Sequence, residues 1–167
     1  MLTLDATAGG SQSNTFVTLA EAESYFASRL PFQKTNWTAA GEDDERKKAA
    51  LISAVEALES LRYAGERTNT RQRLKFPRAG LWTLDLDELD ASEIPRQMKV
   101  AQCELAEYML GQVTPTSSAL DRFDEITLPG GLRIKPRKTS SEGGVIPEHV
   151  LALLADLMLS GSTLLRA

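Results

Sequence analysis

The sequence contains one cysteine and one histidine among 167 residues. A single cysteine cannot form an internal disulfide bond, and the two residues lack the ligand spacing of a zinc site. We therefore expect neither a disulfide framework nor a metal centre. Cys103 lies in an apolar helical pattern, which favours a small buried side chain over a reactive thiol. His149 lies in the first turn of a predicted helix, which favours a surface residue over a catalytic base.

Long apolar runs and phosphate-binding glycine motifs are also missing. No apolar stretch has the length of a membrane-spanning helix, and the first residues lack the pattern of a secretory signal. We therefore expect a cytoplasmic protein with no membrane partner. The glycine pairs at 130–131 and 143–144 lack the lysine and hydroxyl residues of a phosphate loop. These absences predict a protein that is not an enzyme and that has no cofactor.

The chain also has few aromatic residues and no excess of basic over acidic residues. Aromatic residues make up 6% of the chain, and the net charge is −4. A dedicated nucleic-acid-binding protein usually carries a clear basic excess, so this balance argues against one. The length and an apolar fraction of 42% predict one domain with its own core.

The charges that are present form two adjacent blocks of opposite sign. The basic block consists of Arg67, Arg71, Arg73, Lys75 and Arg78. The acidic block consists of Asp85, Asp87, Glu88, Asp90 and Glu93. Such blocks suit docking against another copy of the chain at least as well as docking on phosphate. The acids lack the glycine and the spacing of an EF-hand, which favours a solvated loop over a cation site.

Two aromatic residues near the basic block allow two interpretations. In the first, the arginines follow the phosphates of single-stranded DNA while Phe76 and Trp82 stack on its bases. In the second, which we favour, both aromatic side chains are apolar anchors that hold a long loop against the helices.

Local signals predict a mainly α-helical fold. Thr18 and Glu21 form a capping box that begins a helix over residues 19–30. A second helix begins at the acidic cluster near residue 43 and continues to about Tyr63. A third helix begins at Pro95, a residue favoured in the first turn. Its apolar stripe consists of Met98, Ala101, Leu105, Tyr108 and Met109.

The remaining segments are predicted from their turn and linker residues. The basic segment before Gly80 is a predicted loop, and apolar alternation on both sides of the turn at 129–131 predicts a β-hairpin. A short strand is expected at 16–17. We therefore expect a small bundle of about four helices with a long basic loop, one hairpin and a flexible N-terminal arm. The predicted boundaries within a single domain of residues 1–167 are 1–17 for the arm, 18–112 for the helical core, 120–138 for the hairpin, 139–146 for a flexible linker and 147–160 for the last helix.

A second basic group follows the hairpin turn. It consists of Arg133, Lys135, Arg137 and Lys138. Two interpretations remain open, since these side chains would face either DNA or solvent.

Several short motifs, taken in order and with their spacing, resemble those of a protein family of tailed bacteriophages. This family is often labelled DnaT-like and single-stranded-DNA-binding. The motifs cover about residues 14–110. They are Asn14-Thr15-Phe16-Val17-Thr18, Glu21-Ala22, Tyr25-Phe26, Trp37, Ala49 with Leu51-Ile52, Phe76-Pro77-Arg78-Ala79-Gly80, Ile94-Pro95, Ala101 and Glu104-Leu105-Ala106.

The resemblance implies a structural role. Proteins similar to this chain are head-tail connectors, or adaptors, which form a dodecameric ring under the portal and extend the DNA channel. The implied partners are the portal protein, neighbouring copies, tail or stopper proteins, and packaged double-stranded DNA through non-specific contact. The implied location is the head-tail joint of the virion, reached from the host cytoplasm during assembly. The alternative is a DnaT-like accessory protein that binds single-stranded DNA.

The charge blocks fit such a ring. A closed ring needs two different patches that meet on neighbouring subunits. We hypothesise that the basic segment 67–78 and the acidic segment 85–93 are those patches.

Overall fold

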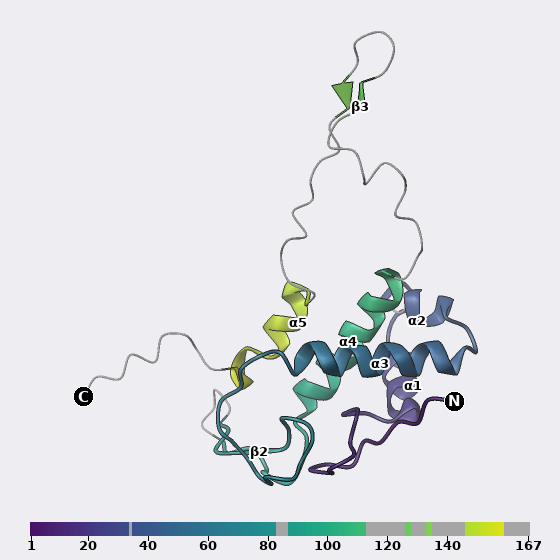
Figure 1. Cartoon of the computed structure of the whole chain (residues 1–167). Coiled ribbons are helices and arrows are strands. Elements are labelled where there is room, and N and C mark those ends of the chain that lie inside the picture. Colours follow the sequence, from purple (N-terminus) through teal and green to yellow (C-terminus); the bar gives the residue numbers. More distant parts are fainter. Residues whose placement is uncertain (34, 83–86, 113–125, 128–132, 135–145, 159–167) are drawn as a thin grey trace.

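The computed structural model describes residues 1–33, 35–82, 87–112, 126–127, 133–134 and 146–158. Helices dominate the described residues, and the strands form two short antiparallel pairs (Figure 1). The prediction of a mainly α-helical fold with a β-hairpin is therefore confirmed.

Helix α1, Leu19–Ala27, begins at the predicted capping box. The Thr18 hydroxyl accepts a hydrogen bond from the Glu21 N–H at 3.2 Å, and the Glu21 carboxylate accepts one from the Thr18 N–H at 2.7 Å. The helix ends three residues before the predicted position. A single turn of 3-10 helix, η1, then follows at Pro31–Gln33.

Helix α2, Thr35–Ala39, was not expected from the sequence. It carries Trp37, which is buried and stacks on Phe26 with the ring centroids 4.4 Å apart. The Trp37 indole N–H donates a hydrogen bond to the Glu23 carboxylate of α1 at 3.1 Å. One aromatic side chain therefore fixes this short helix against α1.

Helix α3, Asp44–Leu58, is capped by the Asp43 carboxylate, which accepts a hydrogen bond from the Arg46 N–H at 3.1 Å. It ends at Leu58 rather than near Tyr63. The Tyr63 hydroxyl donates to the Leu58 carbonyl oxygen at 2.8 Å and so satisfies one of the acceptors that a helix end leaves open.

Helix α4, Arg96–Gln112, lies at the centre of the molecule and contacts α1, α2, α3 and α5 (Figure 1). Met98, Ala101 and Leu105 are fully buried, as their spacing predicted. The prediction is wrong for Tyr108, which is 38% exposed.

Helix α5, Glu148–Leu153, and the 3-10 turn η3, Ala155–Leu157, are shorter than the predicted helix over 147–160. Helix α5 packs against α4. Val150, Leu154 and Leu157 are fully buried, so the segment contributes to the core.

The N-terminal segment 1–17 contains no helix or strand, so the predicted strand at 16–17 is wrong. The expectation of a flexible arm is also corrected. The Asn14 side chain accepts a hydrogen bond from the Asp5 N–H and donates one to the Thr3 carbonyl, both at 2.8 Å. Phe16 is 1% exposed, so this segment is bonded to itself and packed into the core.

Two strand pairs complete the described structure. Strands β1, Glu66–Arg67, and β2, Arg78–Ala79, pair at the base of the basic segment. Strands β3, Ile126–Thr127, and β4, Arg133–Ile134, pair with Ile126 opposite Ile134 and thereby form the predicted hairpin. Residues 139–145 of the predicted linker lie outside the described residues. None of the described helices is long and apolar enough to cross a membrane.

Candidate interface surfaces

The basic segment is a closed loop, which we call the β1–β2 loop and define as residues 66–79. The antiparallel pair Glu66–Arg67 and Arg78–Ala79 joins its two ends. Gly65 precedes it with a φ of +68°, and a Cβ atom at this position would overlap the Ala79 carbonyl oxygen. Only glycine therefore allows the two sides of the loop to approach so closely.

Gln72 holds the interior of the loop. Its side chain is 3% exposed, and its amide nitrogen donates hydrogen bonds to the carbonyl oxygens of Leu74 at 2.8 Å and Pro77 at 3.1 Å. Its amide oxygen accepts from the Asn69 N–H at 3.0 Å. The loop is thus built around a buried amide.

Phe76 anchors the loop to the body. It is 1% exposed, and its ring makes edge-to-face contacts with Phe16, at 6.2 Å between centroids, and with Tyr63, at 4.9 Å. This confirms the interpretation of Phe76 as an apolar anchor and removes it from any base-stacking surface.

Arg78 and Lys75 are engaged within the protein. The Arg78 guanidinium donates to the carbonyl oxygens of Ala64 at 2.6 Å, Lys75 at 3.3 Å, Tyr63 at 3.4 Å and also Gly65. The Lys75 ammonium donates to the Leu61 carbonyl oxygen at 2.6 Å. These two residues hold the loop in place, and the hypothesis that they also face a partner stays a prediction.

Glu59 closes the same corner from the end of α3. Its carboxylate oxygens accept hydrogen bonds from the Lys75 N–H at 2.9 and 3.0 Å. Burial raises the pKa of this carboxyl group, although the Lys75 N–H and the charges of Lys75, Arg67 and Arg78 oppose the shift. Burial also raises the pKa of the neighbouring Tyr63 hydroxyl.

The arginine surface consists of the three remaining basic residues of the loop, Arg67, Arg71 and Arg73, all of which are exposed. Among the described residues, no acidic group forms an ion pair with any of them within 4.0 Å. The backbone N–H of Arg73 donates to the Gly10 carbonyl oxygen at 3.1 Å, which ties the loop to the N-terminal segment. Three side chains of the predicted five therefore offer positive charge to a partner.

The acidic surface consists of Asp87, Glu88, Asp90 and Glu93, which are exposed, whereas Asp85 lies outside the described residues. Asp90 accepts hydrogen bonds from the Ser92 hydroxyl at 2.6 Å and the Ser92 N–H at 2.7 Å. These hydrogen bonds lower the pKa of the Asp90 carboxyl group. The acidic surface thus lies on a segment with its own local structure.

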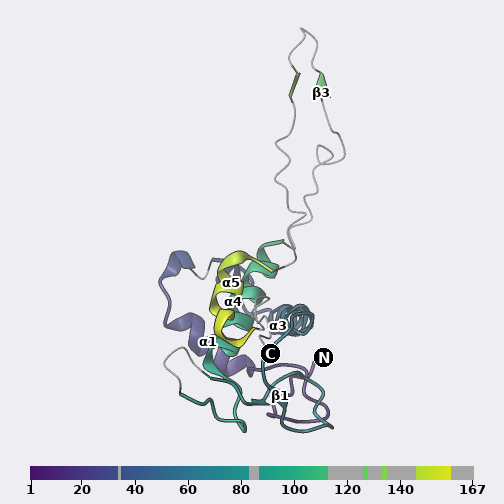
Figure 2. The ribbon, with the colours of Figure 1, turned by 90° about the vertical axis from the view of Figure 1, so that its left-hand side faces the viewer.

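The backbone segments that carry the two charged surfaces lie apart. Figure 2 shows β1 beside the N-terminal segment on one side of the lower end of the molecule, and the chain that leads into α4 on the other side. The chain therefore carries exposed arginines and exposed acids on two different segments.

The two tryptophans differ in exposure. Trp37 is 2% exposed and Trp82 is 54% exposed. Trp82 lies three residues after β2, and its backbone pairs with that of Glu88 in an isolated bridge. The prediction that Trp82 is a buried anchor is therefore wrong.

The second basic group is described only at Arg133, whose backbone lies in β4. Lys135, Arg137 and Lys138 lie outside the described residues, so neither the channel-facing nor the solvent-facing interpretation is tested.

Cys103 is buried and His149 is exposed, as the sequence predicted. Cys103 is 2% exposed, and burial raises the pKa of its thiol to about 12. The His149 side chain is 58% exposed, with its Nε2 atom 3.9 Å from a Glu104 carboxylate oxygen. Within the described part of the chain, no group of three or more possible metal ligands is present.

Sequence reasoning missed two buried polar clusters. Gln102 is fully buried and binds the segment before α1, while Glu104 accepts hydrogen bonds from Tyr25 and Arg29. The available signal for Gln102 was its position four residues after Met98 and three before Leu105, on the buried face of the helix.

No curated protein and no solved structure matches the chain. The sequence model of the family described as "Putative DnaT-like ssDNA binding protein" matches residues 1–166. Because the match spans nearly the whole sequence, the chain belongs to this family.

Proposed function

We propose that the protein is a subunit of a phage head-tail connector, which forms a ring between the portal and the tail and lines the DNA channel. The observation that carries the proposal is that the exposed arginines and the exposed acids lie on two different backbone segments, on different sides of the lower end of the molecule. The resemblance of residues 14–110 to connector proteins supports the same function. In this role the chain would assemble in the host cytoplasm and remain in the virion.

Ring closure explains why the two surfaces need to be different. In a head-to-tail interface, one patch of each subunit meets a different patch of the next, and rotation closes the series. The guanidinium groups of Arg71 and Arg73 form no ion pair among the described residues, so their charge is available to a neighbour. The portal and the tail or stopper proteins would then contact the two faces of the ring.

Charge reversal tests this arrangement. We expect the double variant Arg71→Glu with Arg73→Glu to fold normally and to fail in ring formation on the purified portal, as measured by mass photometry and negative-stain microscopy. The variant Glu88→Arg with Glu93→Arg should fail in the same way. The quadruple variant, which carries both reversals, should form rings again because each interface regains opposite charges.

The rescue is the decisive result. Normal rings from the Arg71 and Arg73 reversal would remove the arginine surface from the interface. Failure of both double variants without recovery in the quadruple variant would mean that the two surfaces do not meet each other. A matched control is Arg62→Glu, which reverses an exposed charge outside the β1–β2 loop and should leave ring formation unchanged.

Binding to single-stranded DNA is the second candidate, and the exposure of Trp82 favours it. The exposed indole of Trp82 offers one stacking group, and the exposed arginines of the β1–β2 loop offer phosphate contacts. The description of the family names the same activity. The net charge of −4 and the burial of Phe76 argue for only a small binding surface.

Fluorescence anisotropy of a labelled oligonucleotide separates the two candidates. Micromolar or tighter binding that weakens steeply with salt, and that is lost in Trp82→Ala and in the Arg71 and Arg73 reversal, would support the DNA-binding function. Trp82→Phe keeps an aromatic face and serves as the matched control. If no binding is detected at low salt, the second candidate is excluded and the connector proposal stands on its own test.

A further inference from the structure

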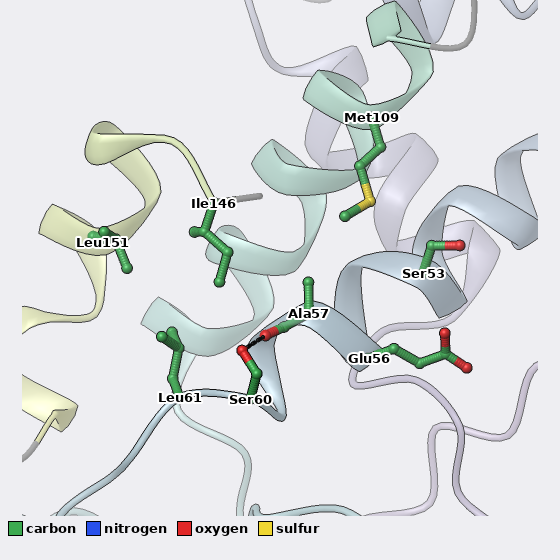
Figure 3. Close-up of a pocket in the computed structure, with 8 residues that line it drawn as sticks. All are labelled: Ser53, Glu56, Ala57, Ser60, Leu61, Met109, Ile146 and Leu151. Carbon is green, nitrogen blue, oxygen red and sulfur yellow. Dashed lines mark hydrogen bonds between the residues drawn. The ribbon is translucent and has the colours of Figure 1, made fainter. Parts of the chain in front are cut away.

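An apolar groove with a volume of about 630 Å³ lies between α3, α4 and the segment that contains α5 (Figure 3). Leu61, Met109, Ile146 and Leu151 provide apolar side chains around Ala57 of α3. Glu56 lies on the rim, with its carboxylate directed to one side in the view of Figure 3. Apolar side chains dominate the lining of this groove.

The described chain ends beside this groove. The Ala64 N–H donates a hydrogen bond to the Leu157 carbonyl oxygen at 2.9 Å, and Met158 pairs with Tyr63 in an antiparallel bridge. Tyr63 lies two residues after Leu61, which forms part of the groove wall. The last described residue is therefore held close to one end of the groove.

Nine residues follow Met158, and their composition suits the groove. They include the apolar residues Leu159, Leu164 and Leu165 and one basic residue, Arg166. Nine extended residues span about 30 Å at most, which is sufficient to cross a groove formed by two or three helices. The adjacent leucines match the apolar wall, and Arg166 matches the charge of Glu56.

We propose that segment 159–167 of the same chain docks in the groove, with Leu164 and Leu165 on its apolar wall and Arg166 near Glu56. A short tether to the groove gives the segment an effective concentration on the order of millimolar, which favours its own chain over a neighbouring copy. The docked segment then acts as a competitor that any other protein must displace before it uses this groove. This inference does not depend on the connector proposal.

Disulfide trapping tests the docking. The test protein carries Ser60→Cys at the groove and Leu164→Cys in the segment, and the natural Cys103 is too buried to compete. Under mild oxidation at low protein concentration, we expect a disulfide within the monomer, seen as a faster band on a non-reducing gel. The matched control keeps Leu164→Cys and moves the partner to Ala27→Cys, an exposed position on α1. Its yield should be at least tenfold lower.

A substitution confined to the segment completes the test. Leu165→Asp, added to the trapping pair, should reduce the disulfide yield to that of the control, whereas Leu165→Met should retain it. Equal yields for the Ser60 and Ala27 pairs would overturn the proposal, as would insensitivity to Leu165→Asp. A covalent ladder of subunits in place of the monomer band would also overturn it, because the segment of a neighbouring copy would then fill the groove.

Discussion

Gln102 of α4 binds the N-terminal segment and helix α3 at once. Its amide nitrogen donates hydrogen bonds to the Thr15 hydroxyl at 2.7 Å and to the Leu51 carbonyl oxygen of α3 at 3.0 Å. Its amide oxygen accepts from the Phe16 N–H, also at 3.0 Å. Because the side chain is fully buried, water cannot replace these partners. Gln102 therefore fixes the N-terminal segment against the two longest helices.

Replacement of this amide by an apolar group should be costly. Gln102→Met keeps a similar volume but leaves the Phe16 N–H without an acceptor, and we expect a loss of about 2 to 3 kcal/mol in the free energy of unfolding. Urea denaturation followed by circular dichroism measures the change. Gln97→Met on the same helix is the control and should change stability by less than about 0.5 kcal/mol. An equally small change for Gln102→Met would show that these hydrogen bonds are dispensable.

Cys103 should be nearly inert in the folded protein. With a thiol pKa of about 12, the thiolate fraction at pH 8 is on the order of one part in ten thousand, against roughly a fifth for a free thiol. Alkylation by iodoacetamide should therefore be at least about a thousandfold slower in buffer than in denaturing urea. Between pH 7 and 9 the native rate should rise about tenfold per pH unit, because ionisation of the raised group is still far from complete.

The measurement is mass spectrometry of the alkylated protein over time. Ala27→Cys supplies an exposed thiol for comparison, and its native rate should approach the rate in urea. Rapid alkylation of Cys103 in the folded protein would contradict the burial on which this prediction rests.

In the β1–β2 loop, the residues that stabilise the loop are different from the residues whose side chains are exposed. Gln72, Phe76 and Arg78 hold the loop from inside, whereas Arg71 and Arg73 extend from it. The loop can therefore lose its exposed charges and retain its shape. This separation makes charge reversal a clean test of interface function.

Arg78→Ala should demonstrate the internal role. The substitution removes four charge-assisted hydrogen bonds to carbonyl oxygens, some of which water can reach, and we expect a cost of about 2 kcal/mol. Arg71→Ala, in the same loop, should cost less than about 0.5 kcal/mol. Both values come from urea denaturation at neutral pH. Similar values for the two variants would mean that Arg78 does not support the loop.

Helix boundaries could be predicted from the sequence where the interactions that set them join residues close together in the chain. The capping box of Thr18 and Glu21 lies within four residues, so the start of α1 was visible in the sequence. The end of α3 was not visible, because it coincides with a hydrogen bond from Tyr63 to Leu58 and with the attachment of Lys75 to Glu59. Helix α2 has five residues, too few for a periodic pattern, and depends on the contacts of Trp37.

The same limit applies to the candidate site. Charge segregation correctly identified the exposed arginines, since a basic run in a polar loop is usually solvated. Charge segregation could not show that Arg78 is engaged within the protein while Arg71 is exposed. The carbonyl oxygens that accept hydrogen bonds from Arg78 come within reach only when the loop closes. The exposure of Trp82 was not predicted either, because the apolar character of a tryptophan side chain by itself favours burial.

At the scale of the whole molecule, the motifs that resemble phage connectors describe the fold. Phe16, Leu51, Phe76 and Leu105 are buried. The Glu104 carboxylate accepts hydrogen bonds from Tyr25 of α1 and from Arg29, which follows α1. Such residues specify a core that can carry different surfaces. The choice between a ring subunit and a DNA-binding protein therefore rests on the exposed arginine and acidic surfaces.

A head-to-tail ring makes a distinctive prediction for mixtures of subunits. A subunit with Arg71→Glu and Arg73→Glu retains its acidic surface, so it can join one neighbour but not the other. If 10% of the subunits carry this change, only about a quarter of twelve-membered rings would contain no defective contact, because every interface is needed for closure. Mass photometry of wild-type and variant mixtures on the portal should therefore show closed rings falling far more steeply than the variant fraction. A loss simply proportional to that fraction would indicate that variant subunits are excluded from the rings, and no loss at all would indicate that the arginine surface lies outside the ring contacts.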